Sequence, residues 1–219
     1  MKRLSIIILL FFGLVYMGSA QTVTIGNQVW MTKNLNVSTF RNGDAIPEAK
    51  TAEEWIKAGE NKQPAWCYYD NDPANGEKYG KLYNWYAVNE PRGLAPEGWH
   101  VPSYGEMTKL IDYLGGEAVA GSKLKSSYGW RKHRNGKDQN GNDSSGFTGL
   151  PGGLISRHLG KFYDITEIGI WWTSSSDREV NKEFYTDGAF DFELGENSNT
   201  IFRSVRFKNN GYSVRCLKD

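Results

Sequence analysis

Hydrophobic and polar residues alternate near both ends of the chain, and this alternation predicts short β-strands. In segment 22–35, TVTIGNQVWMTKNL, apolar and polar residues alternate on both sides of Gly26, which is typical of a β-hairpin. In the C-terminal half, four segments have strand composition, with turns expected at Gly188 and at 209–211. These segments are 169–176, 182–194, 204–210 and 211–219. The pattern favours an α+β fold whose C-terminal half is mostly antiparallel sheet.

Residues 104–114 carry the clearest helix signals. Ser103 and Glu106 have the spacing of a capping box, in which each side chain bonds the backbone N–H of the other. Apolar residues at 110, 111 and 114 form a stripe at helical spacing, and two glycines follow. We therefore predict a helix that begins after Ser103 and ends at the glycine pair.

Two further segments have weaker signals. Segment 51–59, TAEEWIKAG, predicts a short helix with Thr51 as its N-cap and Gly59 as its stop. Segment 79–88, YGKLYNWYAV, fits either a buried strand or a helical turn, because its period does not distinguish them.

His100 lies directly before the predicted helix, in the sequence PEGWHVPS. Pro102 restricts the residues before it to extended geometry, so we expect a strand end that leads into the helix, with Trp99 as a packing anchor. No cysteine, serine or carboxylate constellation surrounds His100 in sequence. We therefore interpret it as a buried hydrogen-bonding residue rather than a catalytic one.

The N-terminus predicts export. Lys2 and Arg3 precede an apolar run that ends in the small residues Gly18, Ser19 and Ala20, which is the pattern of a secretory signal peptide over residues 1–20. A retained membrane anchor is the alternative, although the run is short for a bilayer span. We expect a single mature domain over 21–219, without a stable membrane span, that is secreted, periplasmic or on the outer cell surface.

Charge and composition limit the classes of partner that the protein is expected to bind. The chain has 26 basic and 25 acidic side chains, and removal of the signal peptide takes away two basic ones. This balance does not favour binding to nucleic acid or to an anionic membrane. The 8 tryptophans, 12 tyrosines and 25 glycines instead predict a turn-rich fold whose core contains many aromatic rings.

Cys67 and Cys216 are the two cysteines of the chain. Export makes a disulfide between them chemically permissible, and we predict that they lie close enough to pair. Two buried free thiols are the alternative. A cysteine nucleophile is disfavoured, because the aromatic and acidic neighbours of Cys67 do not lower a thiol pKa.

A polar loop over 134–147 crowds oxygen ligands around Gly141. Asp138, Asn140 and Asp143 supply side-chain oxygens of the kind that calcium prefers. The spacing differs from an EF-hand, so a solvated loop is the alternative. Calcium is accordingly the one possible cofactor, and none is certain.

Seven motifs, in order along the chain, carry a resemblance to a known family. They are IGNQVWMTKNLN, WCYYDND, YGKLYNWYAV, PEGWHVPSYGEM, SSGFTGLPGG, WWTSSS and GYSVRCLKD. Together they resemble the Fibrobacter succinogenes major paralogous (FISUMP) domain family over about residues 22–219. The resemblance implies a secreted or surface-associated protein, without implying an activity. Many members have a cysteine at the position of Ala95, which this chain lacks.

A more distant similarity concerns architecture. GWHVPSYGEMTKL followed by GYSVRCLKD resembles the arrangement of C-type-lectin-like folds and of sulfatase-modifying, formylglycine-generating enzymes. This similarity implies a C-type-lectin-like fold with short antiparallel strands, a few helices and long loops. Such a likeness does not transfer activity.

Three functions compete. The first is a non-catalytic module that binds a polysaccharide or a surface protein, because exposed tryptophan and tyrosine rings stack on sugars and anchor interfaces. On a strand, one indole of Trp171 and Trp172 would face outward, and Tyr69 and Trp130 are further candidates. The EPN and WND signatures of calcium-dependent lectins are absent from the sequence.

The second function is a structural or assembly component of a cell-surface or adhesion complex. Burial of Trp172 would count against the tryptophan site and in favour of this function. The third, an enzyme of the formylglycine-generating type, is the least favoured, because the motifs around Cys67 and Cys216 do not match the active-site cysteines of that family. An aromatic crevice would favour sugar binding, and a flat apolar patch would favour assembly.

Overall fold

The computed structural model describes residues 21–177 and 187–219, so the predicted signal peptide lies outside the described residues. The helices are α1 (Ala52–Glu60), α2 (Pro73–Tyr79), α3 (Trp85–Val88), α4 (Tyr104–Tyr113) and α5 (Glu117–Leu124), with a 3-10 turn η1 at Tyr69–Asn71. The first six strands are β1 (Thr22–Ile25), β2 (Gln28–Met31), β3 (Trp66–Cys67), β4 (Leu82–Asn84), β5 (Trp99–His100) and β6 (Leu154–Ile155). The others are β7 (Phe162–Tyr163), β8 (Ile168–Ser176), β9 (Gly188–Gly195), β10 (Ile201–Phe207), β11 (Gly211–Tyr212) and β12 (Leu217–Lys218). Within these described ranges, no helix is long and apolar enough to cross a membrane.

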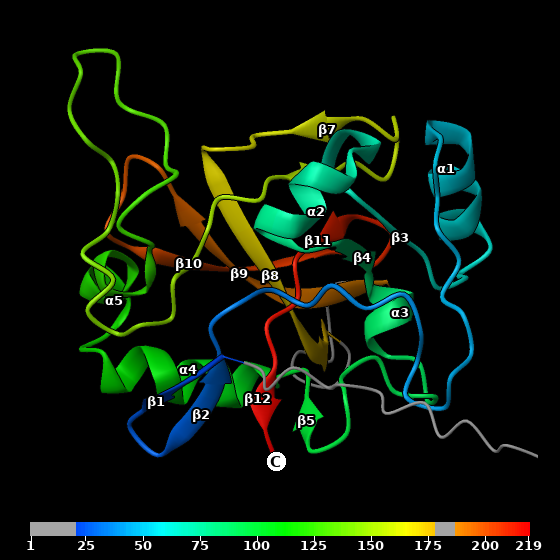
Figure 1. The fold of residues 1–219 in the computed structure, drawn as a ribbon, viewed down its shortest axis with the longest axis horizontal. Helices are drawn as coiled ribbons and strands as arrows, with labels where there is room; N and C mark the ends of the chain where they lie inside the picture. The colour runs from blue at the N-terminus through cyan, green and yellow to red at the C-terminus, as the bar shows by residue number, and fades with distance from the viewer. Residues whose placement is uncertain (1–20, 178–186) are drawn as a thin grey trace, which may run out of the picture.

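The strands of the described part form three sheets (Figure 1). Their strand orders are β1-β2-β12-β5, β10-β9-β8 and β3-β4-β11-β6-β7. The named strands pair antiparallel throughout these sheets. The predicted α+β class with short antiparallel strands is therefore confirmed, and the finer likeness to C-type lectins stays a prediction.

The two ends of the described chain share one sheet. β1 and β2 form the predicted hairpin, and Gly26 adopts a φ of 63° at its turn. The terminal strand β12 lies between β2 and β5, where Leu217 is paired with Trp30 on one side and with His100 on the other. The C-terminus thus completes a sheet that the N-terminal hairpin begins (Figure 1).

α4 forms as the sequence predicts. The capping box is complete: the Ser103 side chain accepts from the Glu106 N–H, and the Glu106 carboxylate accepts from the Ser103 N–H at 2.8 Å. The helix ends one residue earlier than expected, at Tyr113, and the two glycines after Leu114 have positive φ. Its apolar stripe is buried, and this burial seats the helix on the core.

His100 joins three elements. Its Nδ1 lies 2.7 Å from Asp219 Oδ1 beyond β12, and its Nε2 lies 3.1 Å from Glu106 Oε1 in α4. The hydrogen-bonding role is therefore confirmed. The expected burial is only partial, since the side chain is 35 % exposed.

Two other local predictions are partly correct. Thr51 caps α1, but the helix continues past Gly59, where an added Cβ would lie 2.7 Å from Asn209 Cβ. Gly59 therefore serves close packing and is no stop signal. Segment 79–88 contains both predicted forms, because β4 turns into α3 at Asn84, whose side chain accepts from the N–H groups of Ala65 and Ala87.

The C-terminal strands follow the predictions in part. β8 matches the predicted strand 169–176, β10 begins and ends three residues earlier than the predicted strand 204–210, and segment 211–219 contains two short strands, β11 and β12, in place of one. The turn at 209–211 is present, closed by the Asn210 N–H to Phe207 C=O bond. Gly188 is no turn residue, because it opens β9 and is paired with Phe207 of β10. Part of the predicted strand 182–194 lies outside the described residues.

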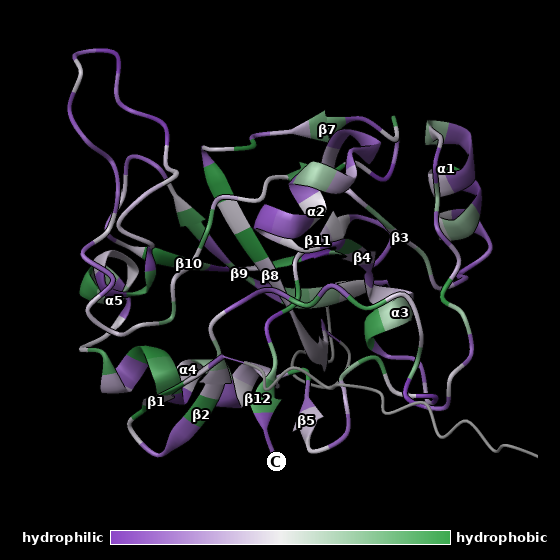
Figure 2. Ribbon diagram, viewed as in Figure 1, coloured by the Kyte–Doolittle hydropathy of each residue, from purple (hydrophilic) through white to green (hydrophobic). Residues whose placement is uncertain are grey.

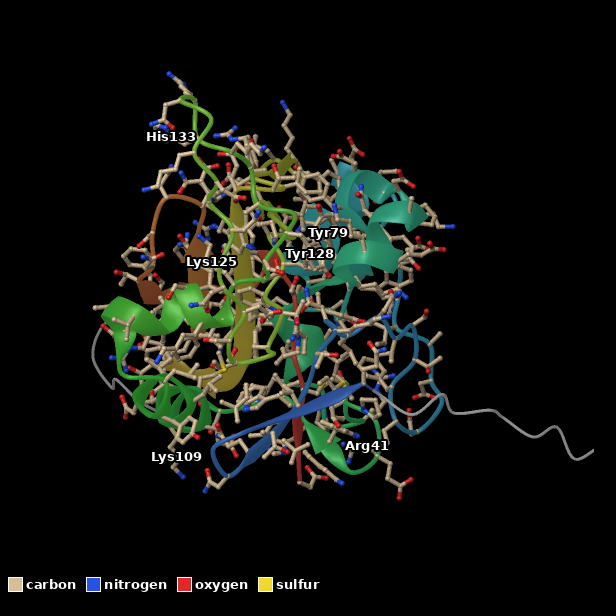
Figure 3. All side chains as sticks on the ribbon, turned by 60° about the vertical axis from the view of Figure 1, so that its left-hand side comes forward. Arg41, Tyr79, Lys109, Lys125, Tyr128 and His133 are labelled. Atoms are coloured by element: carbon tan, nitrogen blue, oxygen red, sulfur yellow. The ribbon has the colours of Figure 1, made fainter. Side chains whose placement is uncertain are left out.

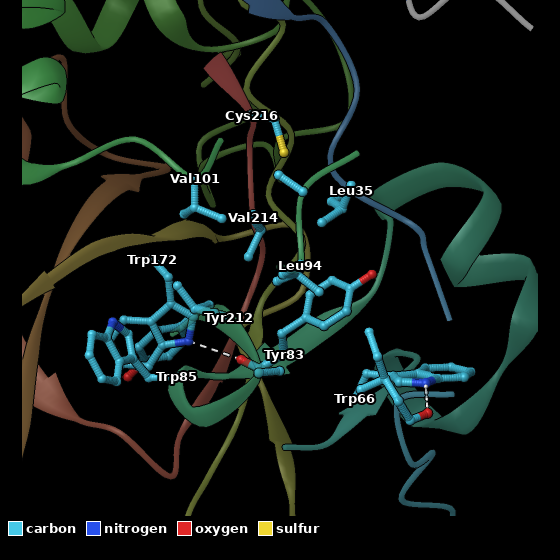
Figure 4. Packing of buried hydrophobic residues seen from close by; sticks show 14 of the residues in the cluster. Leu35, Trp66, Tyr83, Trp85, Leu94, Val101, Trp172, Tyr212, Val214 and Cys216 are labelled. Carbon is cyan, nitrogen blue, oxygen red and sulfur yellow. Dashed lines mark hydrogen bonds between the residues drawn. The ribbon is translucent and has the colours of Figure 1, made fainter. Parts of the chain in front are cut away.

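The buried residues form three clusters. The central cluster includes Trp66, Tyr83, Trp85, Trp172, Tyr212, Val214 and Cys216 (Figure 4). The α4 cluster includes Trp30, Leu110, Ile111, Trp171, Phe192 and Leu194. The α1 cluster includes Trp55, Cys67, Tyr69, Leu82 and Ile155. As composition predicts, aromatic rings supply much of the core.

The predicted disulfide is wrong. Cys67 and Cys216 are both free and fully buried, Cys67 in the α1 cluster and Cys216 in the central cluster. Burial raises the pKa of Cys67 and raises that of Cys216 to about 12. Both residues therefore act as small apolar side chains that fill separate parts of the core.

Candidate functional site

The tandem tryptophans of β8 do face opposite sides of the strand, but neither is exposed. Trp171 is 2 % exposed, packs on Phe147, and donates to Asn34 Oδ1 at 2.8 Å. Trp172 is 1 % exposed, packs on Tyr212, and donates to the Tyr83 carbonyl at 2.9 Å (Figure 4). The expectation of one outward indole is wrong, because both faces of β8 are covered. Neither ring offers a face to a sugar.

Tyr69 and Trp130 are buried as well, so their proposed roles in ligand binding are also corrected. Tyr69 packs on Phe162 with ring centroids 5.2 Å apart. The Trp130 ring covers the buried ammonium of Lys125, and the ring centroid lies 4.4 Å from Lys125 Nζ. The same ammonium donates to three backbone carbonyls. Both aromatic rings therefore serve packing.

Asp138, Asn140 and Asp143, the residues of the predicted calcium site, accept hydrogen bonds from the loop and from the residues that flank it. Asp138 Oδ1 accepts from the Asn140 N–H, and Asn140 Oδ1 accepts from the Trp130 N–H. Asp143 accepts from the N–H and the hydroxyl of Thr148, each at 2.8 Å. Within the described ranges, no cluster of three or more His, Cys, Asp or Glu side chains could hold a metal ion. The loop is better described as one ordered by its own side chains.

A cavity of about 640 Å³ opens beside this loop. Its walls come from segments far apart in sequence: Gln21, 32–36 after β2, 76–80 at the end of α2, Tyr128, 143–150 at and after the end of the polar loop, and Arg215. Asn34 Nδ2 donates to the Tyr79 carbonyl at 2.8 Å, which fixes α2 against the segment after β2. Of the predicted calcium residues, only Asp143 lines the cavity, whereas Asp138 and Asn140 do not.

Arg215 forms the base of the cavity and is 1 % exposed. Its five N–H donors reach neutral oxygens: Asn34 Oδ1 takes two of them, at 3.1 and 2.7 Å, and backbone carbonyls of Met31, Phe147 and Thr148 take the rest. Burial lowers the pKa of Arg215 to about 9, opposed by nearby Cys216 and Asp143. The guanidinium is therefore a buried cation at neutral pH, and it gives the cavity a positive base.

The rim of the cavity is polar, with one aromatic ring. Tyr128 is 53 % exposed, and its loop is held by a 2.6 Å bond from Ser126 Oγ to its carbonyl. The exposed side chains of Lys33, Glu77 and Lys78 complete the rim. An open polar cavity with an exposed ring is suited to a hydrophilic ligand that also has an apolar face.

Apart from Asp143, sequence reasoning missed the residues that build this cavity. Arg215 gave no signal, because a lone arginine in a terminal strand is ordinarily exposed. The one available signal for Tyr128 was its place in the turn-forming stretch SSYG, since aromatic residues in turns are more often exposed than those in strands.

Comparison with curated proteins and with solved structures gives no significant match. The sequence model of a protein family, the Fibrobacter succinogenes major domain, matches residues 23–218. The matched residues include every segment of the cavity except Gln21. The chain therefore belongs to the Fibrobacter succinogenes major domain family.

Proposed function

We propose that this protein is a secreted or surface-associated, non-catalytic module that binds carbohydrate in the cavity above Arg215. The observation that carries the proposal is the exposed ring of Tyr128 on the rim of a polar cavity. Sugars have C–H faces that pack on aromatic rings and hydroxyls that bond to amides and charged groups. The signal peptide predicted over residues 1–20 supports the secreted or surface-associated part of this proposal.

A matched pair of tyrosine variants tests it. Purified protein is applied to a glycan array and to insoluble polysaccharides, and binding is compared between Tyr128→Ala and Tyr113→Ala. Tyr113 is also exposed, at 66 %, but lies in α4 and does not line the cavity. We expect only Tyr128→Ala to reduce binding, by about tenfold, which corresponds to the loss of one stacking contact. Equal binding by both variants would remove the cavity as the site.

Assembly into a surface complex is the second candidate, and the burial of Trp172 adds weight to it. β10 lies at the edge of its sheet, and two of its aromatic side chains, Phe202 and Phe207, are 46 and 39 % exposed. An exposed strand edge can pair with another chain. Light scattering on Phe202→Lys decides this candidate: a concentration-dependent oligomer that the substitution dissolves would favour assembly, and a monomeric parent protein would oppose it.

A further inference from the structure

A basic arm projects beside the cavity. The arm is residues 131–138, RKHRNGKD, and it contains four Arg or Lys residues and one histidine. It extends beyond the rest of the molecule at the upper left of Figure 1, His133 lies near its tip in Figure 3, and most of its length is hydrophilic in Figure 2. All eight residues are exposed. The arm is thus a concentrated patch of positive charge on a chain whose formal net charge is +1.

The arm has a defined shape. Its tip is a turn closed by the His133 N–H to Lys137 C=O bond at 2.9 Å and the Gly136 N–H to His133 C=O bond at 2.8 Å. At its base, the Arg131 N–H donates to the Thr166 carbonyl, and the Arg131 guanidinium contacts Glu167 and Glu196. An arm fixed in this way loses less conformational freedom on binding than an unstructured loop would.

Three cations of the arm are available to a partner. Arg131 is neutralised by its two glutamates, whereas Lys132, Arg134 and Lys137 form no ion pair with any residue that the structure describes. Because these side chains are exposed and form no ion pair with a described residue, no intramolecular ion pair has to be broken before they contact an anion.

The arm and the cavity adjoin. Tyr128 stands just before the arm in sequence, Asp143 comes shortly after it, and both line the cavity. The buried cation Arg215 lies at the base of the same cavity. We propose that cavity and arm together bind an acidic polysaccharide, with one sugar unit against Tyr128 and the carboxylates of adjoining units along Lys132, Arg134 and Lys137. This inference rests on the proposed carbohydrate function and names its ligand class.

An acidic polysaccharide has both chemistries that the two parts require. Its ring faces and hydroxyls match the polar cavity, and its regularly spaced carboxylates match a row of exposed cations. A lipid headgroup or a nucleic acid would also meet the cations. A lipid headgroup, however, offers no ring face to Tyr128. A nucleic acid can stack a base on tyrosine, but the nearly balanced charge of the chain does not favour nucleic-acid binding, so the polysaccharide fits both parts of the surface best.

The test compares one polymer with and without its charge. Polygalacturonate and its fully methyl-esterified form have the same backbone, and only the first is anionic. Binding of both to the full purified protein is measured at low and at high salt. The arm variant carries Lys132→Gln, Arg134→Gln and Lys137→Gln, and the control variant carries Lys57→Gln, Lys62→Gln and Lys109→Gln, which removes the same charge from exposed lysines outside the arm.

We expect the parent protein to prefer the anionic polymer, salt to weaken that preference, and the arm variant to lose about tenfold in affinity for it. The control variant and the esterified polymer should show no such loss. Equal binding of the anionic polymer by the arm variant, with binding still lost in Tyr128→Ala, would overturn this inference and leave the carbohydrate function standing. Arm-dependent binding to phosphatidylglycerol vesicles or duplex DNA, without polygalacturonate binding, would overturn it as well. Absence of binding to every polysaccharide would overturn both proposals.

Discussion

The tryptophan strand β8 and the surface around Tyr128 show opposite relations between residue type and role. β8 carries Trp171 and Trp172, the residues most suggestive of a sugar site, and both are buried in packed clusters. The cavity has a single exposed tyrosine, and its other side chains are mostly polar or charged. The buried rings of β8 contribute to stability, whereas the proposed recognition would take place at the loops, so mutation should separate the two.

Trp172→Ala should have the largest effect on stability. Removal of a fully buried indole leaves a cavity between Tyr83 and Tyr212 and abolishes the bond to the Tyr83 carbonyl. We expect the free energy of unfolding to fall by about 3 to 5 kcal/mol in urea denaturation. Tyr128→Ala is the control, with a change below about 0.5 kcal/mol. An equal loss of unfolding free energy in the two variants would contradict the claim that β8, rather than the surface around Tyr128, supports stability.

Asp191→Asn should change how stability depends on pH. Asp191 of β9 is fully buried without a hydrogen-bond partner in the described residues, and burial raises its pKa to about 7 although Arg206 opposes this. An aspartate in the unfolded chain titrates near pH 4, so the folded state holds a proton between about pH 4 and 7 that the unfolded state has lost. The free energy of unfolding of the parent protein should fall as pH rises through this window.

The asparagine variant does not titrate there. It should be more stable than the parent protein by about 2 to 4 kcal/mol at pH 8 and about equal at pH 4. Urea denaturation of both proteins at pH 4 and at pH 8 measures this difference in the free energy of unfolding. If the free energy of unfolding changed with pH in the same way in both proteins, Asp191 would be ionised in the folded state.

His100→Ala should have a smaller effect. The substitution removes the hydrogen bonds that the His100 imidazole forms with Glu106 of α4 and with Asp219 at the end of the chain. This imidazole is 35 % exposed. We expect a loss of about 1 to 2 kcal/mol in the free energy of unfolding, with no change in bound metal measured by elemental analysis. His133→Ala, in the exposed arm, is the control and should be neutral. A stoichiometric metal that disappears with His100 would contradict the structural role.

Calcium should have the smallest effect. Because the side chains of Asp138, Asn140 and Asp143 already accept hydrogen bonds from the loop and its flanking residues, neither added calcium nor a chelator should shift the melting temperature. Differential scanning fluorimetry with and without chelator checks this. A calcium-dependent rise that Asp143→Asn removes would restore the calcium site.

The amino-acid sequence by itself determined the local elements of this protein. The hairpin at Gly26 and the capping box of α4 depend on hydrogen bonds within about ten residues, and the alternating pattern of β8 lies within the strand itself, so these signals can be read from short stretches of sequence. Family membership was also readable, because it depends on the order of motifs.

Only the tertiary structure decided which side chains are exposed. Asn34 joins Trp171 across 137 positions and Arg215 across 181, and these contacts depend on the path of the whole chain. The alternation of β8 correctly placed its two indoles on opposite faces, yet what covers each face is set by α4, β11 and segments far away in sequence. For the same reason, Cys67 and Cys216 lie in different clusters, and six segments of the chain meet to form the cavity.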